Sequence, residues 1–244
     1  MLKNSLNVII LAIAVVISAF LFSNAFQNRN KSSDTISVTG LGKTDFVSDL
    51  IVWKGSFSKK SSTLKEAYAS LDADREKIKN YLLSKGIPTA DIIFSAISFN
   101  KDYETSYNAN GTVRQTLFTG FTLNQNVSIQ SKDVNKIEDI SRQSSELINT
   151  GVEFYSNAPE YYYTKLAELK IKMIAEATKD ASSRAKSIAE NADATLGNLK
   201  KSDMGVFQII AQNSSEDYSY GGSFNTNSKN KTATITIKLV YQVD

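Results

Sequence analysis

SVTGLGKTD (Ser37–Asp45), followed by FVSDLIVWKGSFS (Phe46–Ser58), is the stretch that decides the fold. Its Gly-Lys-Thr end is that of a phosphate-binding loop, but the motif needs a glycine five positions before Gly42, where this chain has serine. The motif must also open into a helix, whereas Phe46–Ser58 is rich in β-branched and aromatic residues. The stretch therefore argues against nucleotide binding and predicts two strands joined by a turn at Gly40 and Gly42.

Apolar periodicity predicts three helices after these strands. The first begins at a capping box formed by Thr63 and Glu66 and ends at Gly86. The second lies in residues 133–151, and the third, the longest, runs from about 160 to 191. The predicted strands, with Asn110-Gly111 as a hairpin turn, lie in residues 35–40, 45–57, 91–104, 112–130, 152–163, 200–212 and 232–243. Hairpins separated by helices indicate an α+β fold in one compact domain rather than a doubly wound parallel sheet.

An almost wholly apolar run occupies Leu6 to Phe22 near the N-terminus. A core helix rarely lacks a polar face over such a length, so two interpretations remain. One is an uncleaved transmembrane anchor in the inner membrane, with the rest of the chain outside the cytoplasm. The other is a signal peptide cleaved near Ala25, which would release a soluble periplasmic protein. Bulky Phe20 and Phe26 near that site favour the anchor. We therefore divide the chain into a membrane or signal segment (1–26), a polar linker (27–34) and an α+β domain (35–244).

The chain of 244 residues contains no cysteine and no histidine. Disulfides, thiolate nucleophiles, serine–histidine catalysis and zinc-hydrolase sites are therefore excluded. The net charge of +3 is small, and it provides no argument for a nucleic-acid partner. We expect no transition metal, no tightly bound redox cofactor and no enzymatic activity.

Two features indicate surfaces for self-association. The predicted long helix has small side chains at every fourth position, namely Ala177, Ala181, Ala185 and Ala189. They would let the helix approach either the sheet of its own chain or a helix of a second copy. A long polar loop before the last strand contains the aromatic residues Tyr218, Tyr220 and Phe224. Such a loop is typical of a contact surface or of a flexible hairpin tip. We expect a homo-oligomer in which an unpaired strand edge, the alanine stripe or the aromatic loop provides the contact.

The domain resembles the bacterial SIMPL-domain family from about Thr35 to Val243. The resemblance lies in the segments ISVTGLG (36–42), LLSKGIPTADI (82–92), FTGFTLNQNVSI (118–129), EATKDASSRAKSIAENADATLG (176–197) and ATITIKLVY (233–241). It implies an α+β domain of the cell envelope that can assemble into ring-shaped or stacked oligomers. It also implies a link to immunogenic periplasmic proteins and to oxidative-stress defence. No catalytic residue comes with it.

Three functions remain open at the level of sequence. The leading one is a membrane-tethered envelope protein that acts by self-assembly and binding, with the lipid bilayer as partner through Leu6–Phe22. The second is a carrier of a small ligand or lipid, with an apolar cavity enclosed by the sheet and the long helix. The third, and the least supported, is a carboxylate-dependent hydrolase that uses Glu153 and Glu160, which flank an aromatic stretch.

Overall fold

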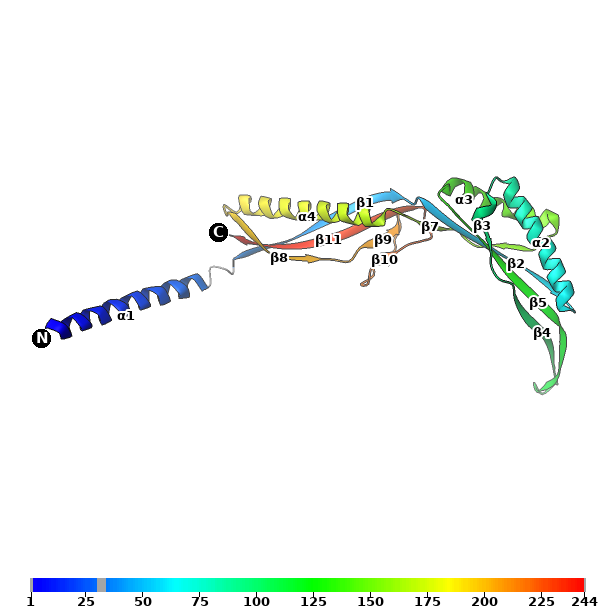
Figure 1. Cartoon of the computed structure of the whole chain (residues 1–244), viewed down its shortest axis with the longest axis horizontal. Helices are drawn as coiled ribbons and strands as arrows, with labels where there is room; N and C mark the ends of the chain where they lie inside the picture. The colour runs from blue at the N-terminus through cyan, green and yellow to red at the C-terminus, as the bar shows by residue number, and fades with distance from the viewer. Residues whose placement is uncertain (1, 30–33, 244) are drawn as a thin grey trace.

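The chain is elongated and contains two lobes. The computed structural model describes residues 2–29 and 34–243, and it describes the side chains of residues 11–26 and 34–243. Helix α1 (Leu2–Arg29) lies at one end, and the two lobes follow along the long axis (Figure 1). We call residues 35–47 and 163–243 the proximal lobe, and residues 50–162 the distal lobe.

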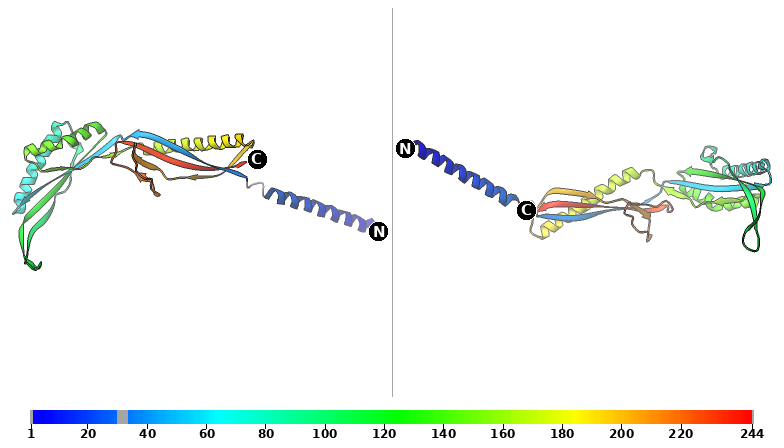
Figure 2. Two further views of the ribbon diagram at one scale, coloured as in Figure 1. Left: turned by 180° about the vertical axis from the view of Figure 1, so that it is seen from behind. Right: turned by 90° about the horizontal axis from the view of Figure 1, so that it is seen from below.

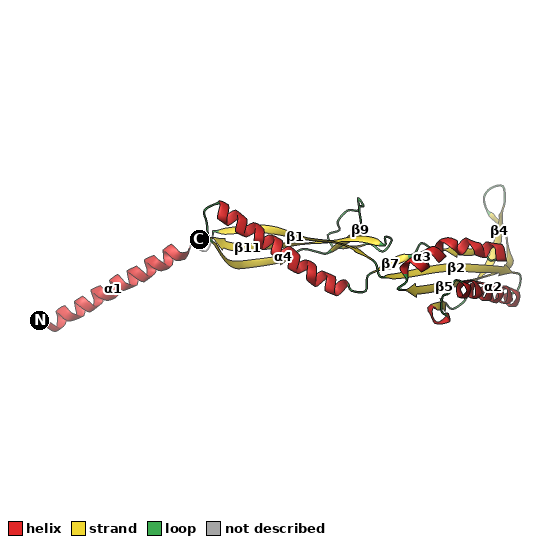
Figure 3. Cartoon of the chain, turned by 90° about the horizontal axis from the view of Figure 1, so that it is seen from above, coloured by secondary structure: helices red, strands yellow, loops and turns green. Residues whose placement is uncertain are grey.

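The proximal lobe is a five-stranded sheet with one long helix on one of its faces. The strands are β1 (Thr35–Val47), β8 (Leu196–Met204), β9 (Gln208–Ala211), β10 (Ser223–Phe224) and β11 (Asn230–Val243). β1 and β11 pair antiparallel over the whole length of β1, and β8 and β9 pair with different parts of β11. Helix α4 (Leu166–Asn191) crosses this sheet (Figure 3).

The distal lobe is a six-stranded antiparallel sheet covered by helices. The strands are β2 (Leu50–Ser61), β3 (Ile92–Phe94), β4 (Ser98–Tyr107), β5 (Val113–Ser131), β6 (Phe154–Ser156) and β7 (Glu160–Tyr162). The helices are α2 (Leu64–Ser84), α3 (Val134–Gln143) and the 3₁₀ turns η1 (Thr89–Asp91) and η2 (Ser144–Thr150). The β4–β5 hairpin extends out of the lobe, beyond the start of α2 (Figures 1 and 2).

Each lobe has its own hydrophobic core. Trp53 and Phe57 of β2 pack with Leu71 and Ile78 of α2 in the distal lobe. In the proximal lobe, the core joins α4 to β1 and β11 through Val38, Met173, Ala177, Ile235 and Ile237. The α+β class is therefore confirmed, but the body differs from the single compact domain that the sequence predicted. A pattern of alternating residues shows that a strand is half-buried, and it does not show which sheet buries it.

The predicted turn at Gly40 and Gly42 is wrong. Both glycines lie inside β1, and the two strands separate instead at Ser48 and Asp49, where the chain passes between lobes. A Cβ atom at Gly40 would lie 2.2 Å from the carbonyl oxygen of Ala177, and one at Gly42 would lie 2.5 Å from that of Met173. These glycines are therefore needed for close packing between strand and helix, not for special backbone angles.

The predicted helices are present, with corrected boundaries. Thr63 caps α2 by accepting a hydrogen bond from the Glu66 amide at 3.3 Å, but the Glu66 carboxylate accepts from Ser61 Oγ and does not complete the capping box. Gly86 ends this helix with a φ of 76°. The second predicted helix divides into α3 and η2. The third predicted helix, α4, begins at Leu166, because residues 160–162 pair with β2 as a strand.

The predicted strands also have corrected boundaries. Residues 91–104 divide between β3 and β4, β8 begins before residue 200, and the hairpin turn at Gly111 is confirmed.

Helix α1 contains the predicted membrane segment. Among the residues that the structure describes, no helix is both long enough and apolar enough to cross a membrane. The side chains of residues 6–10, the first part of the apolar run, lie outside the described residues.

Candidate assembly and binding surfaces

The alanine stripe of α4 packs inside the proximal lobe. Ala177, Ala181 and Ala185 have no exposed surface, and Ala189 is 1% exposed. The Ala181 Cβ would lie 2.8 Å from a Cβ atom at Gly40, so the stripe faces β1 of the same chain. The structure thus has the first of the two predicted arrangements, a helix on its own sheet. The alanines are not exposed on this chain for contact with a second copy.

The aromatic loop lies on the opposite face of the same sheet. Tyr218 is 63% exposed, Tyr220 is fully exposed and Phe224 is 50% exposed. A pocket of about 440 Å³ lies beside them, lined also by Leu41 of β1 and by Val206. The loop thus presents two tyrosines beside an apolar hollow, which is the composition of a contact surface.

Hydrogen bonds hold this loop to the sheet. The Gln208 side chain donates to the Ser219 carbonyl at 2.7 Å and accepts from the Ser219 amide at 3.2 Å. The Glu216 carboxylate accepts from the Ala211 amide at 3.1 Å and from the Asn225 side chain at 2.5 Å. Because β10 also pairs with β9, the segment is a bound loop rather than the free hairpin tip that was the alternative interpretation.

A buried lysine holds the loop, the proximal sheet and the distal lobe together. Lys231 is 1% exposed, and its Nζ donates to the carbonyl of Tyr161 at 2.6 Å and to that of Asn225 at 2.5 Å. The Phe224 ring lies 5.6 Å from the same nitrogen. Burial lowers the pKa of Lys231 to about 8, although Glu216 acts in the opposite direction. Two of the three ammonium donors bond to carbonyls of different segments, and the nitrogen is buried, which indicates a structural role.

A second lysine crosses the same junction. Lys229 Nζ lies 3.0 Å from a carboxylate oxygen of Glu138 on α3, and it also donates to the Asn135 side chain. Burial alone would raise the pKa of Glu138, but hydrogen bonding and charge from Lys229 hold it below its ordinary value. Tyr161 also donates to Glu138, at 3.2 Å.

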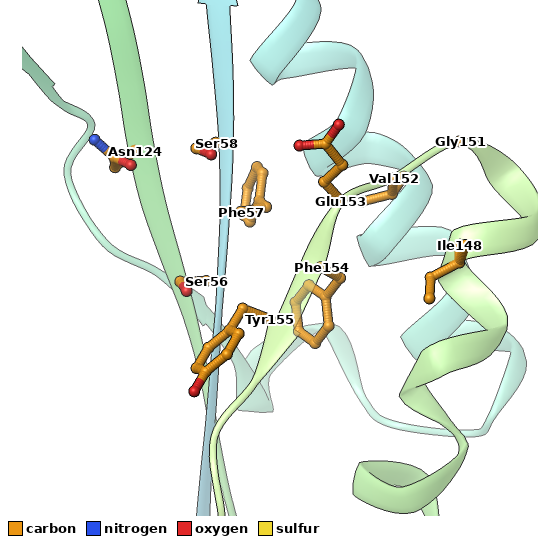
Figure 4. A pocket seen from close by; sticks show the side chains of 10 residues that line it. All are labelled: Ser56, Phe57, Ser58, Asn124, Ile148, Gly151, Val152, Glu153, Phe154 and Tyr155. Carbon is orange, nitrogen blue, oxygen red and sulfur yellow. The ribbon is translucent and has the colours of Figure 1, made fainter.

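A pocket of the distal lobe lies beside β2 and β6 (Figure 4). It has a volume of about 620 Å³ and is lined by Ser56, Phe57, Ser58, Asn124, Ile148, Gly151, Val152, Glu153, Phe154 and Tyr155. On one side, β2 pairs with β5 as far as Ser61. On the other side, β6 pairs only with Gly55 to Phe57, so within the described residues no strand lies beside residues 58–61 on that side. The pocket therefore adjoins a free strand edge, a combination suited to binding an extended apolar segment.

The two glutamates of the hydrolase hypothesis do not line the same pocket. Glu153 lines the pocket, whereas Glu160 lies outside its lining and contacts Lys54 at 3.5 Å and the hydroxyl of Tyr162 at 3.2 Å. At Gly40 the helix α4 contacts β1 directly, and further along the same two elements a pocket of about 430 Å³ is lined by Ser37, Val38, Thr39, Arg184, Ser187 and Ile188. In residues 2–29 and 34–243, no three acidic side chains lie close enough together to hold a metal ion.

Sequence reasoning missed the pocket and the buried lysine. The sequence contains a pattern that predicts the burial of Lys231. Every second residue of β11 from Lys231 onward, namely Ala233, Ile235, Ile237 and Leu239, faces the core, so Lys231 lies on the buried face of the strand. The pocket had no signal, since its lining comes from four separate segments whose proximity depends on the distal fold.

Comparison with known proteins gives one family. The chain matches, over residues 36–241, the family described as SIMPL, protein of unknown function (DUF541). No curated protein matches it. The matched region covers both lobes, from the start of β1 to the end of β11, so the family pattern describes the two-lobed body as a unit. The chain therefore belongs to the SIMPL family.

Proposed function

We propose that this protein is tethered to a membrane of the cell envelope and acts there by self-assembly and binding, without catalysis. The observation that supports the tether most directly is the surface of α1. Large apolar residues between positions 11 and 26 are all exposed, including Leu11 at 69%, Phe20 at 69% and Phe22 at 79%. An exposed apolar surface of this extent over residues 11–26 needs an apolar environment from elsewhere.

The length of the run is compatible with a bilayer. Residues 6–22 as a helix are roughly 25 Å long at about 1.5 Å per residue, against about 30 Å for the hydrocarbon core. A helix somewhat shorter than the core can be accommodated by local thinning of the bilayer. The N-terminal position favours a body outside the cytoplasm.

The tether gives the first prediction. The full chain should remain with the membrane fraction through a high-salt wash and leave it only with detergent, because apolar burial does not depend on salt. Its intact mass should include Met1 or begin very near it. A mature chain that begins at Phe26 and stays in the soluble envelope fraction would overturn the anchor.

Self-assembly gives the second prediction. Tyr218→Ser combined with Tyr220→Ser should leave the fold intact, since both side chains are exposed, and should weaken association about tenfold or more if they anchor a contact. Light scattering of the full chain in detergent over a concentration series measures this. Phe224 is kept because its ring packs over Lys231, so removing it would disturb the junction.

The matched control for this prediction is Ile171→Ser, a 70% exposed apolar residue of α4 that lines none of the pockets described here. It should leave the association unchanged. If the loop variant and the control have the same mass as the wild type, the loop is not an assembly contact. If the wild-type chain is itself monomeric at high concentration, self-assembly is wrong and ligand binding at the pocket of the distal lobe becomes the leading function.

A further inference from the structure

The β4–β5 hairpin forms an arm whose two faces differ in polarity. We call residues 98–121 the arm; it leaves the distal lobe beyond the start of α2 (Figures 1 and 2). Cross-strand pairing places a set of apolar side chains on one face, with ring centroids 5.1 to 6.5 Å apart among the aromatic ones. This aromatic face contains Phe99, Tyr103, Tyr107, Val113, Phe118 and Phe121, and the same pairing also places Lys101, Thr105 and Thr116 on it. The other face contains Asp102, Glu104, Ser106 and Gln115, together with Leu117.

The aromatic face is a continuation of the core. Leu123 is 2% exposed beneath α2, and it pairs with Phe99 on the same side of the sheet. Helix α2 begins at Leu64, so the sheet beyond Leu123 has no helix above it. There the exposed fractions rise to 54% at Phe99 and 57% at Tyr103. The residues that would face a core are thus present, but within the described residues nothing covers them.

The exposed area is large enough for a specific contact. Taking about 200 Å² for a whole aromatic side chain, the exposed part of the aromatic face amounts to roughly 500 Å². Two such faces packed together would bury about 1,000 Å², which is the lower limit for a biological interface. Because exposed apolar patches of this size mark interaction sites, the arm needs a partner.

Charge and shape favour a second copy of this chain as that partner. The arm contains Lys101 and Arg114 against Asp102 and Glu104, so it has no net charge. The charged residue that cross-strand pairing places on the aromatic face is Lys101, and its long side chain can extend from the edge of a contact between two arms to solvent. A lipid surface is disfavoured by the tip, because the residues that would enter it first, Asn108 to Thr112, are polar.

An antiparallel pair of arms also fits the contour of the surface. A pocket of about 440 Å³ lies at the base of the arm, lined by Leu64, Lys65, Tyr68, Ile97, Phe99 and Leu123. In a two-fold pair the tip of one arm lies over the base of the other. Tyr107, which is 63% exposed near the tip, would then reach this pocket, and Tyr103 would lie near the two-fold axis.

We infer that the arm is a dimerisation element, which pairs through its aromatic face with the arm of a second copy. This inference rests on the proposed self-assembly and names one of its contacts. The pairing is isologous and closed, so it accounts for a two-fold contact, and a further surface such as the aromatic loop would be needed for larger assemblies.

The absence of cysteine allows a direct test. Tyr103→Cys should give a disulfide-linked dimer of the full chain in detergent under mild oxidation, because a residue near a two-fold axis lies close to its own copy. The matched control is Glu104→Cys, the next residue on the polar face, which should remain monomeric on a non-reducing gel. Equal cross-linking of the two variants, or none in either, would overturn the arm contact.

A second variant measures the energy of the contact. Tyr107→Ser with Val113→Ser should raise the dissociation constant about tenfold or more, because exposed aromatic side chains are frequent anchors of protein contacts. Glu104→Ser with Gln115→Ser, on the polar face, should not. If the wild type assembles but the arm variants neither cross-link nor dissociate, the arm contact is wrong and self-assembly stands. If the wild type is monomeric by light scattering, both proposals are wrong.

Discussion

Replacing Gly40 with alanine should destabilise the proximal lobe by about 3 kcal/mol or more, at the upper end of the range for overpacking. The added methyl group would lie 2.2 Å from the Ala177 carbonyl oxygen and 2.4 Å from the Ala181 amide nitrogen. Both are backbone atoms of a helix, so neither can rotate away as a flexible side chain would. Relief requires α4 to move off β1, which would open the apolar core between them.

Urea unfolding of the full chain in a non-ionic detergent measures this effect. The single tryptophan, Trp53, is 1% exposed in the distal core, so its fluorescence reports that lobe, while circular dichroism reports both. We expect Gly40→Ala to shift the circular dichroism transition to lower urea concentration. The control is Gly221→Ala, since a Cβ atom there meets nothing within 4 Å and φ is not positive. It should be neutral or slightly stabilising. Equal transitions for the two variants would show that α4 does not approach β1 as closely as described.

Gly40 also shows where prediction from sequence ends. A glycine in an apolar, β-branched stretch is compatible with a turn, a bulge or a close backbone approach. The choice depends on α4, which lies more than 120 residues further along the chain. The small residues on both sides, Gly40 with Gly42 and Ala177 with Ala181, are complementary, but this is visible only once the helix is placed on the strand. Local patterns therefore predicted the helices and most strands, and failed where the outcome depended on long-range packing.

Of the candidate contact surfaces, one could be predicted from local sequence and one could not. The aromatic loop could be found because tyrosines in a long polar segment stand out locally. The arm was predicted as a hairpin, but its uncovered face could not be found, because that depends on where α2 begins relative to Leu123. Phe99, Tyr103 and Tyr107 lie on one face of the strand at every fourth position, and only the three-dimensional arrangement shows that no helix buries them.

Lys231 connects the fold to a measurable dependence on pH. Its pKa falls from 10.5 to about 8 through burial in the folded chain, whereas the unfolded chain exposes it to water. Between these two values the unfolded state binds more protons than the folded state. The stability contributed at this site is therefore lowest below about pH 8 and rises as the pH increases toward 10.5. Buried tyrosines act in the opposite direction at the upper end, because burial raises the pKa of Tyr81 and Tyr161 and their unfolded forms ionise first.

The contribution of Lys231 can be isolated by comparing the free energy of unfolding of the wild type with that of Lys231→Met at each pH. The tyrosines are the same in both proteins, so their contribution cancels in the difference. From pH 7 to pH 10 the free energy of unfolding of the wild type should rise relative to that of Lys231→Met by about 3 kcal/mol, from about 1.4 kcal/mol per pKa unit. Urea unfolding at intervals of half a pH unit measures the difference. Lys238→Met, an exposed lysine on the same strand, is the control and should follow the wild-type profile. Parallel profiles for wild type and Lys231→Met would mean that the ammonium keeps an ordinary affinity for its proton. In that case the carbonyls of Tyr161 and Asn225 would compensate fully for the loss of water, and the junction would hold a charged lysine at every pH at which the chain is folded.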